Sequence, residues 1–198
     1  MKNAYALLGV LFLVLIVGSA YAFNRVSVSP GINNMIIQSM TDTLSLTSSA
    51  FENGKSIPSK YTCDGNPPAG GVSPPLSWSG VPEGATSLVL IMDDPDAIKP
   101  AGKVWDHWVV FNIPPDTVSA EEGRGPNGVQ GVTSSGKGGY GGPCPPDAKH
   151  RYFFRLYALD SDLSLEEGAT KADVLAAMDG HIIGQGELMG KYQRTASR

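Results

Sequence analysis

Glycine and proline interrupt the apolar residues of this chain so often that long helices have little room. The 198 residues include 24 glycines and 15 prolines, and 41% of all residues are hydrophobic. Between these breaks the apolar runs have the length of strands, as in residues 88–92, which are all apolar. A continuous run of this kind favours a strand that is buried on both faces. The pattern predicts a mainly β protein with one domain, since the chain is short for two.

Three further segments have the pattern of strands: residues 105–113, residues 150–159 and residues 187–192. One helix is expected between Thr170 and Gly180. Thr170 is followed three positions later by an acidic residue, which is a variant of the capping box, and glycine is a common helix terminator. We therefore expect a short helix near the C-terminus, followed by a last strand.

Alternation along a strand sorts its side chains by face. In each of the two longer predicted strands it aligns a histidine with large apolar residues, and it places His150 beside Tyr152. We therefore expect each histidine to lie where the core gives way to the rim of the domain. The predicted sets are Trp105, His107, Val109 and Phe111 in the first strand, and His150, Tyr152, Phe154 and Leu156 in the second.

The N-terminal residues are predicted to be a targeting segment outside the domain. Lys2 precedes an apolar stretch with an A-x-A ending at residues 20–22, which is typical of a secretory signal peptide. An uncleaved anchor is the alternative, because the stretch approaches the roughly 20 residues that span a bilayer. Either way the domain is expected outside the cytoplasm, secreted, periplasmic or membrane-anchored. The expected organisation is signal peptide or anchor at residues 1–22, linker at residues 23–42 and domain at residues 43–198.

The predicted export changes how the two cysteines, Cys63 and Cys144, are interpreted. In an oxidising compartment a single pair favours one disulfide, which would here close a long loop. Two buried free thiols are the alternative. Metal ligation is less expected, because neither cysteine belongs to a C-x-x-C pair.

Charge narrows the classes of partner. The formal net charge is −4, and no run of Lys or Arg forms the basic stripe that phosphate-backbone binding needs. We therefore expect no nucleic-acid partner, and membrane contact only through the N-terminal segment if it is uncleaved.

Polar side chains gather at the ends of the predicted strands. Asp94 and Asp96 close one strand, while His107, His150 and Tyr152 lie near the starts of two others. Imidazole, with an unperturbed pKa of about 6.5, changes charge near neutral pH, and a neighbouring carboxylate raises that pKa. An imidazolium, a tyrosine hydroxyl and loop N–H groups form a donor-rich site suited to phosphate or carboxylate.

The glycine-rich residues 123–143 could bring backbone N–H groups to such a ligand, although a flexible surface loop is the alternative. Two enzymatic alternatives are weaker. A zinc site formed by His107, His150 and Asp94 would have no H-x-H or H-x-x-x-H pair to set two ligands on one element. A serine hydrolase would lack its G-x-S-x-G motif. We expect no enzyme, no cofactor and no metal.

Ordered motifs are spread along nearly all of residues 43–192, at residues 50–54, 61–65, 73–78, 94–97, 105–110, 112–114, 139–146, 150–160, 177–181 and 187–192. Together they resemble the phosphatidylethanolamine-binding protein (PEBP) family. The resemblance is to its bacterial and archaeal branch, which is called YbhB/YbcL-like or Raf kinase inhibitor-like.

The resemblance implies an antiparallel β-sandwich with a short C-terminal helix and a small cavity for anions such as phosphate, phosphorylated headgroups or acetate. One departure is visible: Ile98 stands where the family usually has proline, so we expect a differently shaped rim. The cavity residues that carry over by position are Asp94, His107, Pro145, His150 and Tyr152, with Asp96, Trp105 and Gly142 nearby.

The expected function is therefore an extracytoplasmic, non-enzymatic module that binds a small anion or phosphorylated headgroup. One alternative is a protein inhibitor of an exported hydrolase or protease. A weaker one is a metal-dependent hydrolase.

Overall fold

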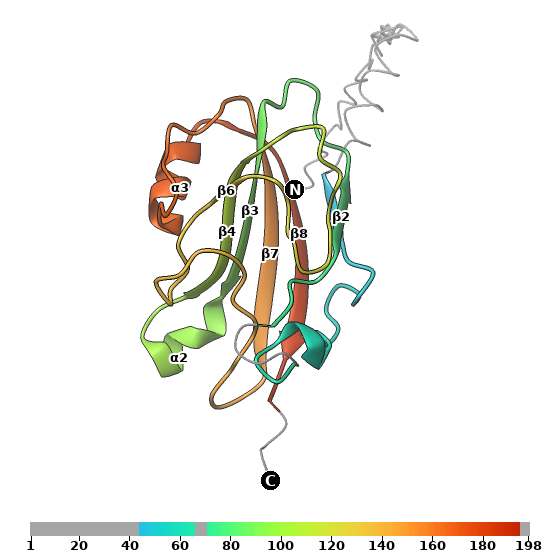
Figure 1. The fold of residues 1–198 in the computed structure, drawn as a ribbon, viewed down its shortest axis with the longest axis vertical. Coiled ribbons are helices and arrows are strands. Elements are labelled where there is room, and N and C mark those ends of the chain that lie inside the picture. Colours follow the sequence, from blue (N-terminus) through green and yellow to red (C-terminus); the bar gives the residue numbers. More distant parts are fainter. Residues whose placement is uncertain (1–43, 66–70, 195–198) are drawn as a thin grey trace, which may run out of the picture.

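The computed structural model describes residues 44–65 and 71–194, and it contains two antiparallel sheets (Figure 1). The smaller sheet has the order β1-β2-β5 and the larger has the order β6-β4-β3-β7-β8. This confirms the predicted mainly β, antiparallel sandwich. The strands are β1 (Ser45–Thr47), β2 (Leu76–Ser79), β3 (Ser87–Asp94), β4 (Trp105–Ile113), β5 (Ser119–Ala120), β6 (Val129–Gln130), β7 (His150–Leu159) and β8 (Ile182–Tyr192).

Helices are short and lie outside the sheets. They are η1 (Ser59–Tyr61), η2 (Pro95–Ala97), α2 (Ile98–Ala101) and α3 (Lys171–Met178). The capping box predicted at Thr170 is present: its side chain accepts from the Asp173 N–H, and the Asp173 carboxylate accepts from the Thr170 N–H. Since these bonds satisfy free N–H groups of the first turn, α3 begins where the sequence indicated.

The larger sheet is covered on both faces, which explains the continuous apolar run at residues 88–92 of its central strand. One cluster, with Leu90 and Trp108, fills the space towards the small sheet; the other, with Val89 and Val174, lies under α3. In Figure 1, α3 and β2 lie on opposite sides of the large sheet. Every residue of β3 is buried, as predicted for residues 88–92.

Trp105, His107, Val109 and Phe111 were predicted to share one face of β4, and this prediction is wrong for Val109 and Phe111. Met92 pairs with Trp108 but the next residue, Asp93, pairs with Asp106, so His107 is an extra residue in β4. Such a β-bulge ends strict alternation. Trp108 lies in the cluster that faces the small sheet, whereas Val109 and Phe111 lie in the cluster under α3.

An ion network centred on the buried Asp93 attaches α3 to the large sheet. The Lys171 ammonium lies 2.6 Å from Asp93 and 2.9 Å from Asp106, so it connects α3 to β3 and β4. Arg155 of β7 lies 2.8 Å from Asp93 and 2.9 Å from Glu187 of β8. The network therefore ties the helix and four strands together on the face opposite the small sheet.

The predictions for residues 1–22 and residues 23–42 fall outside the described residues. Within the part that the structure describes, no helix has the length and apolarity that a membrane span needs.

Candidate functional site

A cavity of about 520 Å³ opens where the end of β3 meets the starts of β4 and β7. The segment between Thr133 and Pro146 covers it, so the second half of the predicted glycine-rich loop contributes to its wall. Of the eight site residues predicted from the sequence, the structure brings seven to this wall: Asp94, Trp105, His107, Gly142, Pro145, His150 and Tyr152.

Asp94 holds the end of β3 in place with both carboxylate oxygens. Oδ1 accepts from the N–H groups of Asp96 at 2.9 Å and Ala97 at 3.2 Å, which caps η2. Oδ2 lies 2.6 Å from Nδ1 of His150. One buried carboxylate therefore fixes both the turn after β3 and the first side chain of β7.

Asp96 does not line the cavity. Its carboxylate accepts from Arg151, at 2.9 Å from both the backbone N–H and Nε and at 2.6 Å from Nη2. The guanidinium holds the pKa of Asp96 below its usual range. Asp96 thus cross-links η2 to β7 beside the site, next to the pair formed by Asp94 and His150.

His150 has a carboxylate on each ring nitrogen. Besides Asp94 at Nδ1, Asp147 lies 2.9 Å from Nε2. Burial alone would lower the pKa of His150, but hydrogen bonds and attraction from Asp94 and Asp147 outweigh it and raise the pKa. The imidazolium therefore donates to two protein carboxylates. Asp147 was not singled out from the sequence, since an exposed acid in a loop carries no periodic signal.

His107 has the opposite character. Its ring lies 2.7 Å from the Gly141 carbonyl through Nδ1, and a carbonyl only accepts, so Nδ1 carries the proton. Burial lowers the pKa of His107, against smaller contributions from Gly141 and nearby carboxylates that raise it. The neutral tautomer leaves Nε2 as an acceptor with no hydrogen-bond partner among the described residues.

Tyr152 points its hydroxyl into a buried position without a partner. Its oxygen makes no hydrogen bond to any described residue. The ring packs edge-on against His107, with 5.2 Å between centroids, and stacks with His150 at 6.5 Å. Burial, followed by the charge and the polar contact of the Asp94 carboxylate, raises the pKa of Tyr152, so the hydroxyl keeps its proton. A buried donor without an acceptor is unfavourable unless a ligand completes it.

The cavity also has lining residues that the sequence analysis did not assign to it. Lys137 lies in its wall and has no ion-pair partner among the described residues, whereas the lining carboxylates of Asp94 and Asp106 face His150 and Lys171. On the side after η2, Pro100 and Ala101 form the wall. Ile98 does not line the cavity and is 56% exposed, so any effect on the rim comes from the α2 turn that it begins.

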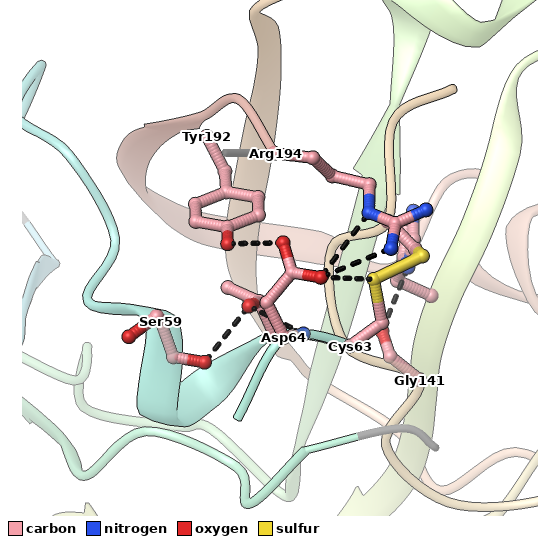
Figure 2. The surroundings of a disulfide bond; sticks show 9 residues. Ser59, Cys63, Asp64, Gly141, Tyr192 and Arg194 are labelled. Atoms are coloured by element: carbon pink, nitrogen blue, oxygen red, sulfur yellow. Dashed lines mark hydrogen bonds and ion pairs between the residues drawn. A yellow bond between two sulfur atoms is a disulfide. The ribbon is translucent and has the colours of Figure 1, made fainter. Parts of the chain in front are cut away.

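The predicted disulfide is formed. Cys63 and Cys144 are bonded with 5.4 Å between their Cα atoms, and both line the cavity. Figure 2 shows the bridge beside Asp64, whose carboxylate accepts from the Tyr192 hydroxyl at 2.7 Å and from Arg194 at 3.2 Å. The Cys63 N–H also donates to the Pro143 carbonyl at 3.1 Å. The bridge thus joins the turn after η1 to the loop that covers the cavity.

The geometry gives no support to the zinc alternative. Asp94 is committed to His150 and to η2, and His107 points Nδ1 at a backbone carbonyl. Within residues 44–65 and 71–194, no three His, Cys, Asp or Glu side chains are grouped to hold a metal ion.

Comparison with known proteins agrees with this architecture. The family model described as phosphatidylethanolamine-binding protein matches residues 47–193. A UPF0098 protein of Methanothermobacter thermautotrophicus is 57% identical over 157 residues, which cover 76% of this chain and 99% of that protein.

Solved structures show the same likeness. The PEBP homologue CT736 of Chlamydia trachomatis superposes with a TM-score of 0.72 at 51% identity, covering 78% of this chain and all of that one. YbcL of E. coli, described as a new member of the mammalian PEBP family, has a TM-score of 0.69 at 31% identity and covers 77% of this chain and 99% of its own.

Proposed function

Because this chain belongs to the phosphatidylethanolamine-binding protein family, we propose that its cavity binds a small anion, in the first place the phosphate group of a phosphorylated small molecule or headgroup, without catalysing a reaction. The observation that carries this proposal is the buried Tyr152 hydroxyl without a partner beside the unpartnered Nε2 of His107. An anion oxygen would satisfy the hydroxyl and would accept from Nε2 once that atom is protonated.

Charge at the cavity supports an anionic ligand. Each lining carboxylate faces a cationic partner: Asp94 faces His150 and Asp106 faces Lys171. Lys137 is the lining cation without such a partner among the described residues. The loop glycines add backbone without side chains, which lets a ligand approach the main chain closely.

The histidines support binding without catalysis. Nucleophilic catalysis needs a hydroxyl or thiol next to a base. In the described part of the chain, His150 bonds two carboxylates and the Nδ1 of His107 bonds a backbone carbonyl. Neither imidazole hydrogen-bonds a nucleophile.

The site predicts that ligand binding is coupled to proton uptake. His107 is neutral when the cavity is empty, because burial lowers its pKa. The dianion of a phosphate monoester has no proton of its own to donate to Nε2, so binding of this form adds a proton at Nε2. Affinity should therefore rise as the pH falls, by up to about tenfold per pH unit for one proton.

Calorimetric titration with inorganic phosphate and O-phosphorylethanolamine at pH 6 and pH 8 tests the proposal. We expect tighter binding at pH 6, and we expect His107→Ala to weaken binding at least tenfold at pH 6 and to reduce its pH dependence. His181→Ala is the matched control, because His181 is half-exposed and bonds Asp160 instead of lining the cavity.

Absence of binding at both pH values, or equal affinities for the wild type and His107→Ala, would refute the anion site. Protease inhibition that survives His107→Ala would favour the alternative of a protein inhibitor of an exported hydrolase.

We further propose that the protein acts outside the cytoplasm. The apolar N-terminal stretch with its A-x-A ending and the Cys63–Cys144 bridge support this location, since disulfides persist in oxidising compartments. Cell fractionation of the full chain should place it outside the cytoplasm, and removal of residues 1–22 should retain it inside. Equal distributions of the two forms would contradict the proposed location.

A further inference from the structure

We propose that the Cys63–Cys144 bridge is a site of thiol–disulfide exchange that controls the cavity: a dithiol reductant opens it, releases the loop from Cys144 to Lys149 and lowers ligand affinity. The effect on affinity rests on the anion binding proposed above. The release of the loop does not, and it can be measured separately.

The Cys144 side of the bridge is weakly attached to the rest of the domain. From Cys144 to Lys149 the backbone makes no hydrogen bond to another backbone group of the described residues. The side-chain contact that holds this stretch is the bond between Asp147 and His150. Pro145 is buried and the other residues of the stretch are exposed, so apart from the packing of this ring the covalent bond is the principal tether of the loop.

The Cys63 side is firmly held without the bridge. The Thr62 N–H and hydroxyl donate to the Ser59 carbonyl at 3.0 and 2.8 Å, and Gly65 N–H donates to the Thr62 carbonyl at 3.0 Å. Asp64 is bonded to Tyr192 and Arg194 (Figure 2). Reduction should therefore leave the turn after η1 in place and free only the Cys144 side.

The freed loop carries part of the cavity wall. Cys144, Pro145 and Pro146 line the cavity, and the preceding Gly141 carbonyl fixes the tautomer of His107. Movement of this segment opens the wall beside His150 and loosens its bond to Asp147. A ligand would lose enclosing contacts from this side, so the bridged form is the high-affinity form.

Cys144 is exposed and Cys63 is only half-buried, so a reductant can reach the bridge. A thiolate of the reductant attacks one bridge sulfur, the bond between the two cysteines breaks, and a mixed disulfide forms. The second thiol of the reductant then displaces the cysteine. Both cysteines end as thiols after uptake of two electrons and two protons, and the dithiol ends as a disulfide.

Two measurements on the full domain test this inference. The first is calorimetric titration of oxidised, dithiothreitol-reduced and reoxidised protein with inorganic phosphate and O-phosphorylethanolamine at pH 6. We expect affinity to fall at least tenfold on reduction and to return on reoxidation. A Cys63→Ser/Cys144→Ser double variant should bind like the reduced protein and should not respond to dithiothreitol, which controls for effects of the reagent.

The second measurement is backbone 15N relaxation of the wild-type protein, which does not depend on any ligand or on folding of the variant. The amides of residues 144 and 147–149 report the motion of the loop, since residues 145 and 146 are prolines. We expect reduction to lower the order parameters of these amides and to leave those of residues 59–65 and β3 unchanged. Unchanged order parameters at residues 144 and 147–149, or a fall that extends throughout the large sheet, would overturn the inference. Equal affinities of oxidised and reduced protein would overturn it too. If neither form binds either probe, the anion-site proposal fails and the relaxation measurement alone decides the fate of the loop.

Discussion

Three side chains at the cavity wall differ in protonation because their neighbours differ. His150 faces two carboxylates and is held charged, and His107 faces a carbonyl and is held neutral. Tyr152 keeps its proton but has no acceptor among the described residues. The same residue type therefore serves two purposes here: one histidine is a charged structural link and the other is the group that can change its proton on binding.

Replacing Tyr152 by Phe should separate binding from stability. The change removes a buried, unpartnered hydroxyl and keeps the ring, so the free energy of unfolding should stay equal or rise slightly. Phosphate affinity should fall on the order of tenfold, since a hydrogen bond to an anion is worth about 1.5–3 kcal/mol. Urea unfolding and calorimetry measure the two effects. A large loss of stability with unchanged affinity would show that the hydroxyl has a structural partner instead.

Asp147 should set the pKa of His150. We expect the imidazole signals of His150 to titrate above the ordinary value of about 6.5, and Asp147→Asn to move that midpoint down. A raised pKa in the folded state stabilises the fold below the unfolded value of about 6.5, and this stability is lost as the pH rises through the folded pKa. NMR titration of the histidine Cε1–H signals measures the shift. Asp162→Asn is the control, and equal midpoints for wild type and Asp147→Asn would contradict the assignment.

At the scale of elements, two irregularities build the site on an otherwise regular sheet. The extra residue in β4 aligns His107 with the cavity while Val109 and Phe111 pack under α3. The cap that Asp94 places on η2 ends β3 at the cavity edge. The Lys171 network on the opposite face of the sheet reaches the cavity through Asp106, so the helix and the cavity share this contact.

Lys171→Met should reduce stability and should also weaken phosphate binding, because it leaves the Asp106 carboxylate in the cavity wall without its cation. The Lys171 side chain is 17% exposed and its ammonium pairs with Asp93, whose side chain is 7% exposed. Loss of one partner of a buried pair costs roughly 3–5 kcal/mol, and we expect about 2 kcal/mol because Arg155 stays beside Asp93. Urea unfolding measures the loss, with the exposed Lys99→Met as control. Unchanged phosphate affinity would show that the Asp106 carboxylate does not act on the bound anion.

At the scale of the whole molecule, the fold is a central sheet with an apolar cluster on each face and one covalent bond between distant segments. The clusters do not include either cysteine, so the domain should remain folded when the bridge is reduced. The bridge instead restricts the conformations of the unfolded chain and of the loop beside the cavity.

Reduction should lower the free energy of unfolding without unfolding the domain. The bridge spans 81 residues, and the chain-entropy model gives about 4.5 kcal/mol for a loop of that size. Urea unfolding with and without dithiothreitol measures the difference. A loss near zero would indicate that the reduced, unfolded chain keeps these segments together.

Local patterns in the sequence were sufficient for the regular elements. Residues 105–113 and 150–159 coincide with β4 and β7, and the capping box locates the start of α3, because strand boundaries and helix caps depend on neighbouring residues. The last strand was expected only over residues 187–192. It begins earlier, at Ile182, because pairing with β7 extends it through glycines that have little strand preference.

Motif positions also brought seven of the eight expected residues to one cavity, and the spacing of the cysteines was compatible with the bridge. What only the tertiary structure decided is how those residues are used: the bulge at His107, the two carboxylates on His150, the role of Asp96 as partner of Arg151, and the place of Lys137 in the wall. These features arise from pairings between segments far apart in the chain. Such pairings depend on strand register and loop packing, and neither leaves a periodic trace in the sequence.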